Sequence, residues 1–314
     1  MVEQELAADF ELRLNPSDTP TTPESLRAAL RDADGVLCTV TDRLDASALD
    51  VEPLRARILA NFGVGHEHID LAAAARRGLA VTNTPDVLTD ATAELALTLM
   101  LMVARRAGEG ERELRAGRWT GWRPTHLIGR PLTGRTLGII GMGRIGRTVA
   151  RRAREGFGMH VLYVTRSPLP PGQVAAEACA RIEDLLPRSD FVSLHAPATP
   201  ETRHLMNAAR LALMRPTAYL INSARGSLVD QQALAAALRA GTIAGAGLDV
   251  YEREPDVPRE LLQLENVVLL PHLGSATDEA RTAMGRRAHQ NLRAFFAGAA
   301  IPDPISPDPN PCSP

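Results

Sequence analysis

A glycine-rich turn, GMGRIG at residues 141–146, has the spacing of a phosphate-binding loop. It follows the apolar run TLGII, which indicates a strand, and it precedes a helical pattern that begins at Arg144. Gly141, Gly143 and Gly146 would permit a tight turn, close approach of the backbone to a pyrophosphate, and close packing of helix on strand. The helix N-terminus would add free N–H groups and a partial positive charge. Glycines occur in any tight turn, so the prediction of a dinucleotide site depends on the flanking strand and helix.

The end of the next expected strand, LYVTRSP at residues 162–168, lies about 20 residues beyond this turn, where an Asp or Glu usually binds the ribose 2′-hydroxyl of NAD. The chain has Thr165, Arg166 and Ser167 there instead. Their presence removes the repulsion of a 2′-phosphate and adds a guanidinium and two hydroxyls that suit one. The alternative is that Arg166 is only a solvated surface side chain. We expect the site to prefer NADPH, with NADH also possible.

Three further stretches place polar side chains at the ends of expected strands or shortly after them. INSARGSLVD contains Arg225, GLDVYEREP contains Asp249 and Glu254, and VVLLPHLGSAT contains His272. Open α/β sheets bind their ligands beyond the carboxyl ends of the strands, so these side chains are candidates for a reaction site. Any one of them alone would more commonly be a surface or structural residue.

The elements that would position these residues alternate between strand-like and helix-like patterns, which indicates an α/β fold with parallel sheets. The strands expected are 10–14, 35–40, 57–62 and 79–83 in a first series, and 136–140, 160–164, 190–195, 218–223, 244–250 and 267–272 in a second. The helices expected are 25–33, 47–56, 68–78, 91–106, one from residue 144, and 279–298. Most of these strands are rich in Val, Ile and Leu without strict alternation, which fits strands covered on both faces. The fold class expected is therefore two doubly wound parallel-sheet domains, a Rossmann-type cofactor domain and a smaller flavodoxin-like substrate domain.

Composition excludes several other classes of protein. The 314 residues carry a net charge of −2, which offers no field for nucleic acid or an anionic membrane. All 35 basic residues are arginines, so lysine chemistry is excluded. The three cysteines, Cys38, Cys179 and Cys312, are too few and too scattered for a disulfide framework or a metal site. The first residues have no signal-peptide pattern, and no apolar run is long enough to cross a membrane. We expect a soluble, cytoplasmic protein without a metal.

Read together in order, the motifs identify a family. The chain resembles the D-2-hydroxyacid dehydrogenases, and most closely their glyoxylate/hydroxypyruvate reductase branch. The resemblance runs nearly end to end, and several of its motifs are specific at this order and spacing. They are NFGVGHEHID, VTNTPDVLTDATAEL, GRWTGWRP, GMGRIG, SLHAPATPET, INSARGSLVD, GLDVYEREP and PHLGSAT.

The resemblance implies a role for each matched residue. Arg225 would bind the substrate carboxylate and polarise its carbonyl. His272 would protonate the carbonyl oxygen, with Glu254 orienting its ring and favouring its charged form. The N–H groups of Val64 and Gly65 would bind the carboxylate from the other domain, and Trp122 would reach the substrate pocket of a partner subunit or else be a packing residue. The residues expected at the cofactor are Gly141, Gly143, Arg144, Ile145, Gly146, Thr165, Arg166, Ser167, His195, Pro197, Ser223, Ala224, Asp249 and Gly274.

The activity implied is NADPH-dependent reduction of small 2-oxoacids, glyoxylate and hydroxypyruvate, to glycolate and D-glycerate by a homodimer built on residues 89–128. A sister enzyme is the nearest alternative. Phosphoglycerate dehydrogenases often carry a further C-terminal domain, for which residues after His272 leave no room, and formate dehydrogenases of this fold have Gln where this chain has Glu254. A nucleotide-sensing, corepressor-like binding protein is the alternative from another class. Turnover of a 2-oxoacid would separate it from an enzyme.

The segment order predicts a discontinuous substrate domain, residues 1–85 and 278–314, around a dinucleotide-binding domain, residues 86–277. Family members usually open with a strand, a helix and a second strand, whereas this sequence starts inside the helix and leads into FELRL at 10–14. Without its first strand a flavodoxin-like sheet would contain two unpaired strand edges. We therefore expect about 15 to 20 further residues before Met1 in the natural chain. The proline-rich end, residues 301–314, is expected to be disordered.

Overall fold

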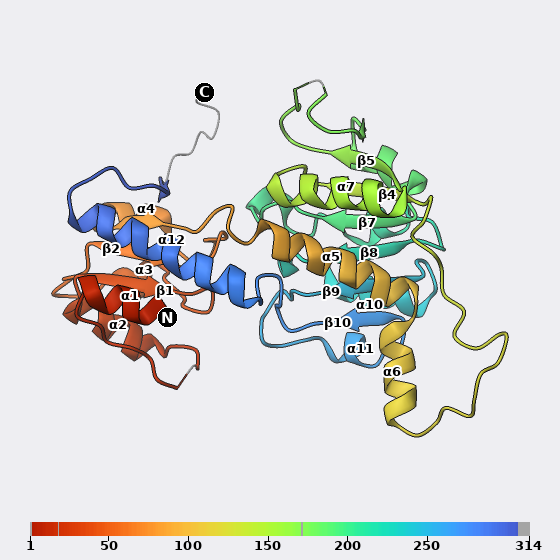
Figure 1. Ribbon diagram of the computed structural model, residues 1–314, viewed down its shortest axis with the longest axis horizontal. Coiled ribbons are helices and arrows are strands. Elements are labelled where there is room, and N and C mark those ends of the chain that lie inside the picture. Colours follow the sequence, from red (N-terminus) through yellow and green to blue (C-terminus); the bar gives the residue numbers. More distant parts are fainter. Residues whose placement is uncertain (1, 18, 171, 307–314) are drawn as a thin grey trace. The chain divides into compact units, whose positions relative to one another are not determined.

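The computed structural model describes residues 2–17, 19–170 and 172–306. These residues divide into two compact units (Figure 1). The first unit comprises the described parts of residues 1–88 and 276–314, and the second comprises residues 89–275. No helix in the described part of the chain combines the length and apolarity needed to cross a lipid bilayer.

The second unit is built on a sheet of seven strands in the order β10-β9-β8-β7-β4-β5-β6, and each neighbouring pair is parallel. The strands are β4 (Thr136–Ile140), β5 (His160–Val164), β6 (Glu177–Ala178), β7 (Phe191–Leu194), β8 (Tyr219–Asn222), β9 (Gly245–Leu248) and β10 (Val267–Leu269). The order reverses between β4 and β7, where the chain leaves β4 for one side of the sheet and returns at β7 for the other. Ligands of open α/β sheets bind at such a switch point.

Helices cover both faces of this sheet (Figure 1), which explains why its central strands are apolar without alternation. The buried residues of α5 and α7 pack with one face, and those of α8, α9, α10 and α11 pack with the other. The helices are α5 (Thr89–Ala104), α6 (Ala107–Arg115), α7 (Arg144–Phe157), α8 (Ile182–Leu185), α9 (Ala208–Leu211), α10 (Gln231–Arg239) and α11 (Arg259–Leu262), with short 3₁₀ turns η1 (Leu186–Arg188), η2 (Pro200–Thr202) and η3 (Gly226–Leu228).

The first unit has a smaller sheet in the order β1-β2-β3-β11, in which β11 is antiparallel to β3 and the other pairs are parallel. Its strands are β1 (Gly35–Cys38), β2 (Ile58–Asn61), β3 (Ala80–Thr82) and β11 (Pro304–Ile305). Its helices are α1 (Val2–Asp9), α2 (Pro23–Asp32), α3 (Ala46–Leu49), α4 (Leu71–Arg76) and α12 (Asp278–Phe296). One hydrophobic cluster joins the sheet to α2, α3 and α4, and another joins it to α1 and α12. The predicted α/β class with two sheets is confirmed.

Three predictions of local structure are wrong. Residues 10–14 form no strand, although Phe10 and Leu12 pack against the cluster beneath α1 and α12, because the segment has no strand beside it to pair with. The helix expected over 47–56 ends at Leu49, and Pro53, which disfavours helix in the residue before it, follows closely. Residues 304–305 form β11 rather than a disordered tail, while 307–314 lie outside the described residues.

Candidate functional site

The glycine turn lies at the switch point of the larger sheet. Gly141 has φ +98°, and a Cβ there would lie 2.6 Å from the backbone nitrogen of Ala196, which follows β7. A Cβ on Gly146 would collide with the carbonyl oxygen of Gly141, whereas a Cβ on Gly143 would meet nothing within 4 Å. The first and third glycines are therefore required by the packing of this turn. At the second, Gly143, the backbone has free space beside it, so a pyrophosphate can approach it closely.

The N-terminus of α7 follows this turn directly. Gly143 is its N-cap residue, and its carbonyl oxygen accepts the N–H of Arg147 at 2.9 Å. The N–H groups of the first turn of a helix have no acceptor within the helix, and the helix dipole gives this end a positive potential. Arg144 is exposed, and Ile145 packs against the core beneath α5 and α7. These residues fit a bound dinucleotide phosphate.

The end of β5 adjoins the glycine turn, since the N–H of Gly141 donates to the carbonyl of Val164 at 2.9 Å. Thr165 is partly buried, and Arg166 and Ser167 are exposed. Arg166 is close enough to Glu201, in η2, to contribute to the lowering of the pKa of that carboxyl, after the hydrogen bond from Thr199 and the backbone. The three residues expected at a 2′-phosphate thus lie beside the expected phosphate loop.

The segment after β7 contributes His195 and Pro197. The Nε2 atom of His195 lies 2.9 Å from the hydroxyl oxygen of Ser193. Burial of the ring lowers the pKa of His195 to about 4, so the ring is neutral near neutral pH. Pro197 is exposed, and its carbonyl accepts the hydroxyl of Thr202 at 2.8 Å. A neutral ring at this position lines the switch point without adding charge.

The turn after β8 holds Ser223, Ala224 and Arg225. Ser223 is buried, and Arg225 is partly buried with its Nη1 donating to the carbonyl of Ala224 at 2.6 Å. Asn222, the last residue of β8, accepts the N–H of Ala224 at 3.1 Å and donates to the carbonyl of Arg225 at 2.8 Å. Gly226 has no room for a side chain, because a Cβ there would collide with the backbone of Tyr251. The position of the guanidinium is therefore set by a turn held on both sides.

Glu254 and His272 lie within hydrogen-bond distance although they are 18 positions apart. The distance from Oε2 of Glu254 to Nδ1 of His272 is 2.7 Å, and the N–H of Tyr251 donates to Oε1 at 2.9 Å. Burial raises the pKa of Glu254, but the hydrogen bond and charge of His272, with smaller contributions from Tyr251 and Arg225, lower it overall. Because Nδ1 faces the carboxylate, Nε2 is the ring atom left to exchange a proton with a substrate.

Asp249, directly after β9, fixes the backbone around this histidine. The N–H of His272 donates to the carbonyl of Asp249 at 2.9 Å, and the N–H groups of Leu273 and Gly274 donate to its carboxylate at 2.7 and 2.8 Å. His272 takes a left-handed conformation with φ +56°. Burial raises the pKa of Asp249 despite these hydrogen bonds. Asp249 thus holds the loop that presents His272 and Gly274, in addition to any contact with a cofactor.

Val64 and Gly65 lie in the turn after β2 of the first unit. The carbonyl of Val64 accepts the side-chain amide of Asn83 at 2.8 Å, and the carbonyl of Gly65 accepts that of Asn61 at 2.7 Å. Within the described part of the chain, the N–H groups of Val64 and Gly65 donate no hydrogen bond. The turn therefore presents two N–H donors to an anion.

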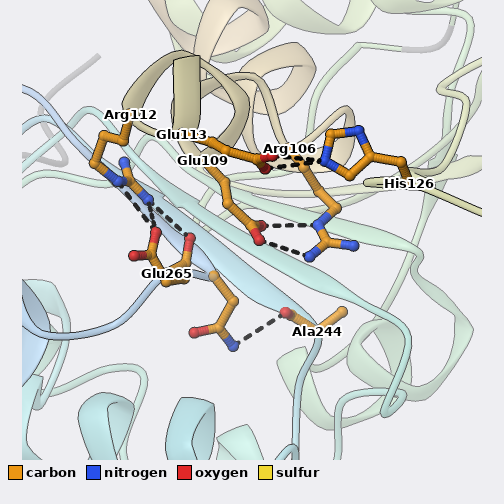
Figure 2. Close-up of polar contacts among 8 residues, drawn as sticks. Arg106, Glu109, Arg112, Glu113, His126, Ala244 and Glu265 are labelled. Atoms are coloured by element: carbon orange, nitrogen blue, oxygen red, sulfur yellow. Dashed lines mark hydrogen bonds and ion pairs between the residues drawn. The ribbon is translucent and has the colours of Figure 1, made fainter. Parts of the chain in front are cut away.

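Trp122 does not follow a strand of the second unit, unlike most of the other expected site residues. Its side chain is 82% exposed, in the segment between α6 and β4. Hydrogen bonds hold the start of this region (Figure 2): Nε2 of His126 lies 2.9 Å from Oε2 of Glu113, and Nε of Arg112 lies 3.1 Å from Oε2 of Glu265. The segment that carries Trp122 is thus fastened at α6 while its indole faces outward.

Sequence analysis missed two residues of these turns, Asn61 and Asn222. Each is a buried asparagine that ends a buried strand and precedes a turn. That placement was visible in RILANF and AYLINS, because a polar amide at the end of an apolar run needs hydrogen-bond partners in the turn that follows.

The sheet order, with a glycine turn at its switch point, defines a dinucleotide-binding α/β protein. Residues 97–274 match the family model described as D-isomer specific 2-hydroxyacid dehydrogenase, NAD binding domain. The chain belongs to this family and is an NAD(P)-dependent dehydrogenase.

Similar proteins extend the likeness over nearly the whole chain. The chain is 48% identical over 302 residues to a glyoxylate reductase of Thermococcus kodakarensis, covering 95% of this chain and 90% of that protein. It is 45% identical over 302 residues to a glyoxylate reductase of Pyrococcus furiosus, covering 95% and 89%. Among solved structures, the NADPH-dependent glyoxylate/hydroxypyruvate reductase of Sinorhizobium meliloti, in complex with NADP and malonate, has a TM-score of 0.85 at 39% identity and covers 97% of this chain and 92% of that chain.

Proposed function

We propose that the protein is a glyoxylate and hydroxypyruvate reductase that prefers NADPH, and that it forms glycolate and D-glycerate. The observation that carries the proposal is the 2.7 Å contact between Glu254 and His272 in the unit that holds the glycine turn. The names of the relatives in Thermococcus kodakarensis and Sinorhizobium meliloti support the choice of substrates.

In this proposal His272 is the proton donor. When bound, the dihydronicotinamide supplies the hydride to the carbonyl carbon of the 2-oxoacid. The oxygen of that carbonyl then gains negative charge, and Nε2 of His272 gives it a proton. Glu254 holds the ring by Nδ1 and favours its protonated form, because an opposite charge lies within hydrogen-bond distance. In the oxidation direction the neutral ring takes the proton back.

The carboxylate of the substrate would be bound by Arg225 and by the N–H groups of Val64 and Gly65. A guanidinium offers a planar pair of donors that matches a carboxylate. Arg225 would also polarise the substrate carbonyl as charge develops on its oxygen, which is the kind of stabilisation that contributes most in enzymes. A 2-oxoacid has its carboxylate next to the reacting carbonyl, so one guanidinium can serve both groups.

The cofactor would be held by the glycine turn and by the ends of the neighbouring strands. Gly141, Gly143 and Gly146, with Arg144 and Ile145, would bind the pyrophosphate, and Thr165, Arg166 and Ser167 would bind the 2′-phosphate of NADPH. The adenosine would lie along His195 and Pro197. The nicotinamide carboxamide would meet Asp249, Ser223, Ala224 and Gly274. The residues that directly follow β5 in the sequence include no acid that would bind a 2′-hydroxyl and repel a 2′-phosphate, which supports NADPH over NADH.

A panel of 2-oxoacids at saturating NADPH tests the choice of substrate. The proposal predicts that kcat/KM is highest for glyoxylate or hydroxypyruvate. A higher value for pyruvate or 3-phosphohydroxypyruvate would assign the chain to another specificity within the family. Absence of turnover with every 2-oxoacid, together with intact NADPH binding, would reject an enzymatic function.

The exposed apolar residues around α6 support a homodimer. Leu114, Trp119, Trp122 and Ile128 are 61%, 51%, 82% and 65% exposed. Large apolar side chains gathered on one exposed segment mark an interaction surface. A second copy of the chain would cover them, with Trp122 reaching the partner's substrate. Light scattering should give twice the 33.8 kDa chain mass, and Trp122→Ser should reduce dimerisation or raise KM.

We also propose a cytoplasmic location. Cys38 and Cys179 are free thiols, as is usual in a reducing compartment. Fractionation of the native cells would test it, since recovery of the protein outside the cytoplasmic fraction would contradict it.

A further inference from the structure

Asn61 lies beneath the turn that presents Val64 and Gly65. It is the last residue of β2, and its side chain is 0% exposed. Its Nδ2 donates to two carbonyl oxygens of the turn, that of Gly63 at 3.1 Å and that of Gly65 at 2.7 Å. Carbonyl oxygens can only accept hydrogen bonds, so the nitrogen of this amide must be the atom that faces them.

Hydrogen bonds to the carbonyl groups of the turn determine the directions in which its N–H groups point. The carbonyl of Gly63 and the N–H of Val64 belong to one planar trans peptide and point in opposite directions, as do the carbonyl of Val64 and the N–H of Gly65. The carbonyl of Gly63 accepts from Asn61 and, at 3.0 Å, from the N–H of Thr84. The carbonyl of Val64 accepts from Asn83 at 2.8 Å. Fixing the two carbonyls therefore turns the two N–H groups the opposite way.

The other atom of the same amide indicates that packing is not the reason for an asparagine here. Oδ1 of Asn61 is buried and has no hydrogen-bond partner among the described residues. A buried acceptor without a partner is costly, and an apolar side chain of similar size would avoid the cost. The asparagine is thus explained by its Nδ2 group, which donates to the carbonyl oxygens of the turn.

The second unit contains the same arrangement. Asn222 ends β8, is 1% exposed, and holds the turn of Ala224 and Arg225 through both atoms of its amide. In each unit a buried asparagine at the end of a strand fixes the turn from which the substrate carboxylate would be bound.

We propose that Asn61 is a positioning residue for the substrate: it does not touch the 2-oxoacid, but through the carbonyls of Gly63 and Gly65 it holds the turn in place and orients the N–H of Val64 toward the carboxylate. This inference rests on the proposed function. It predicts an effect on substrate affinity without an effect on cofactor affinity, because none of the residues expected at the cofactor lies in the first unit.

The test compares Asn61→Leu and Asn61→Ser with the control Thr82→Val. Thr82 is also 0% exposed, lies on the neighbouring strand β3, and has a buried hydroxyl without a partner among the described residues. We expect each Asn61 variant to raise KM for glyoxylate about tenfold, which corresponds to a loss of ~1.4 kcal/mol of binding. The value of kcat should fall much less, and the Kd of NADPH should not change. Thr82→Val should leave all three constants unchanged.

Binding of oxalate, a dicarboxylate whose binding can be measured without turnover, separates this inference from the proposed function. A wild-type chain that turns over no 2-oxoacid would reject the proposed function, while weaker protection of the Asn61 variants against heat by oxalate would still support positioning. Folded Asn61 variants with an unchanged KM and unchanged oxalate binding would overturn the inference. If neither variant folds while Thr82→Val does, Asn61 serves stability alone, and the inference is equally overturned.

Discussion

Replacing Glu254 with Gln changes the charge next to His272 while keeping the size of the side chain. In the native chain one carboxylate oxygen lies 2.7 Å from Nδ1 of His272 and the other accepts the N–H of Tyr251 at 2.9 Å. A glutamine has only one acceptor oxygen, so it can satisfy one of these two donors and presents an amide nitrogen to the other. The variant therefore loses an opposite charge and one hydrogen bond.

The size of the effect follows from the geometry. Two unit charges about 4 Å apart attract each other by about 4 kcal/mol at an effective dielectric constant of about 20. The side chains of His272 and Glu254 are 35% and 34% exposed, so water screens the pair, and about 1 to 2 kcal/mol is a better figure. Since ~1.4 kcal/mol corresponds to a factor of ten, loss of the carboxylate should lower kcat/KM for reduction by about tenfold.

The assay is the pH dependence of kcat/KM for glyoxylate reduction with NADPH. Reduction requires the protonated ring, and an adjacent carboxylate favours that form, so the high-pH limb of the profile should move to lower pH in the variant. Glu252→Gln is the matched control, because Oε1 of Glu252 lies 3.1 Å from Nε2 of His204 rather than beside His272. Its profile should coincide with that of the parent.

Glu254 should also affect how the free energy of unfolding depends on pH. The pKa of this carboxyl is lowered in the folded chain, so its contribution to the free energy of unfolding is present above its unfolded pKa and is lost as the pH falls through the folded value. In Glu254→Gln the free energy of unfolding should therefore fall less between neutral and acidic pH than in the parent.

For the reaction itself, a pH–rate profile that does not move in a folded Glu254→Gln variant would refute the pairing of Glu254 with His272.

Further substitutions test the other parts of the site. Arg225→Ala should lower kcat/KM, with a loss of roughly 3 to 5 kcal/mol of transition-state stabilisation, because carboxylate binding and carbonyl polarisation are lost together. Activity within about threefold of the parent would show that Arg225 is not part of the site. Arg166→Ala should raise KM for NADPH and leave KM for NADH nearly unchanged, whereas equal losses would indicate a folding defect. Gly226→Ala should displace the turn that carries Arg225, since its Cβ would collide with the backbone of Tyr251; thermal unfolding should show a lower Tm together with reduced kcat/KM, and a fully active, equally stable variant would contradict the geometry.

The strands of the second unit were predictable because their burial on both faces leaves a direct record in the sequence. A strand such as β7 or β8 contacts helices on each side, so its residues are apolar without alternation. Residues 10–14 misled the prediction, since alternation of Phe10 and Leu12 with charged residues reports one buried face and says nothing about a neighbouring strand. Elements as short as β6 and β11 carry too few residues for any period to be visible.

The residues of the candidate site also differ in how far the sequence alone predicted them. The glycine turn was predictable from spacing, because each glycine has a local steric reason. The contact of Glu254 with His272 was expected from resemblance, since their separation along the chain gives no hint that β9 and β10 bring them together. Asn61 and Asn222 were overlooked because their partners are backbone atoms, which have no signature in a sequence.

One two-by-two assay tests the central claim most directly: glyoxylate and hydroxypyruvate, each with NADPH and with NADH at equal low concentrations, using the purified chain. The proposal predicts that both acids are reduced, and that NADPH is oxidised faster than NADH with each, because Arg166 lies where an acid would repel the 2′-phosphate. Faster oxidation of NADH with both substrates would contradict the proposed cofactor preference, and absence of reduction of either acid would contradict the proposed activity.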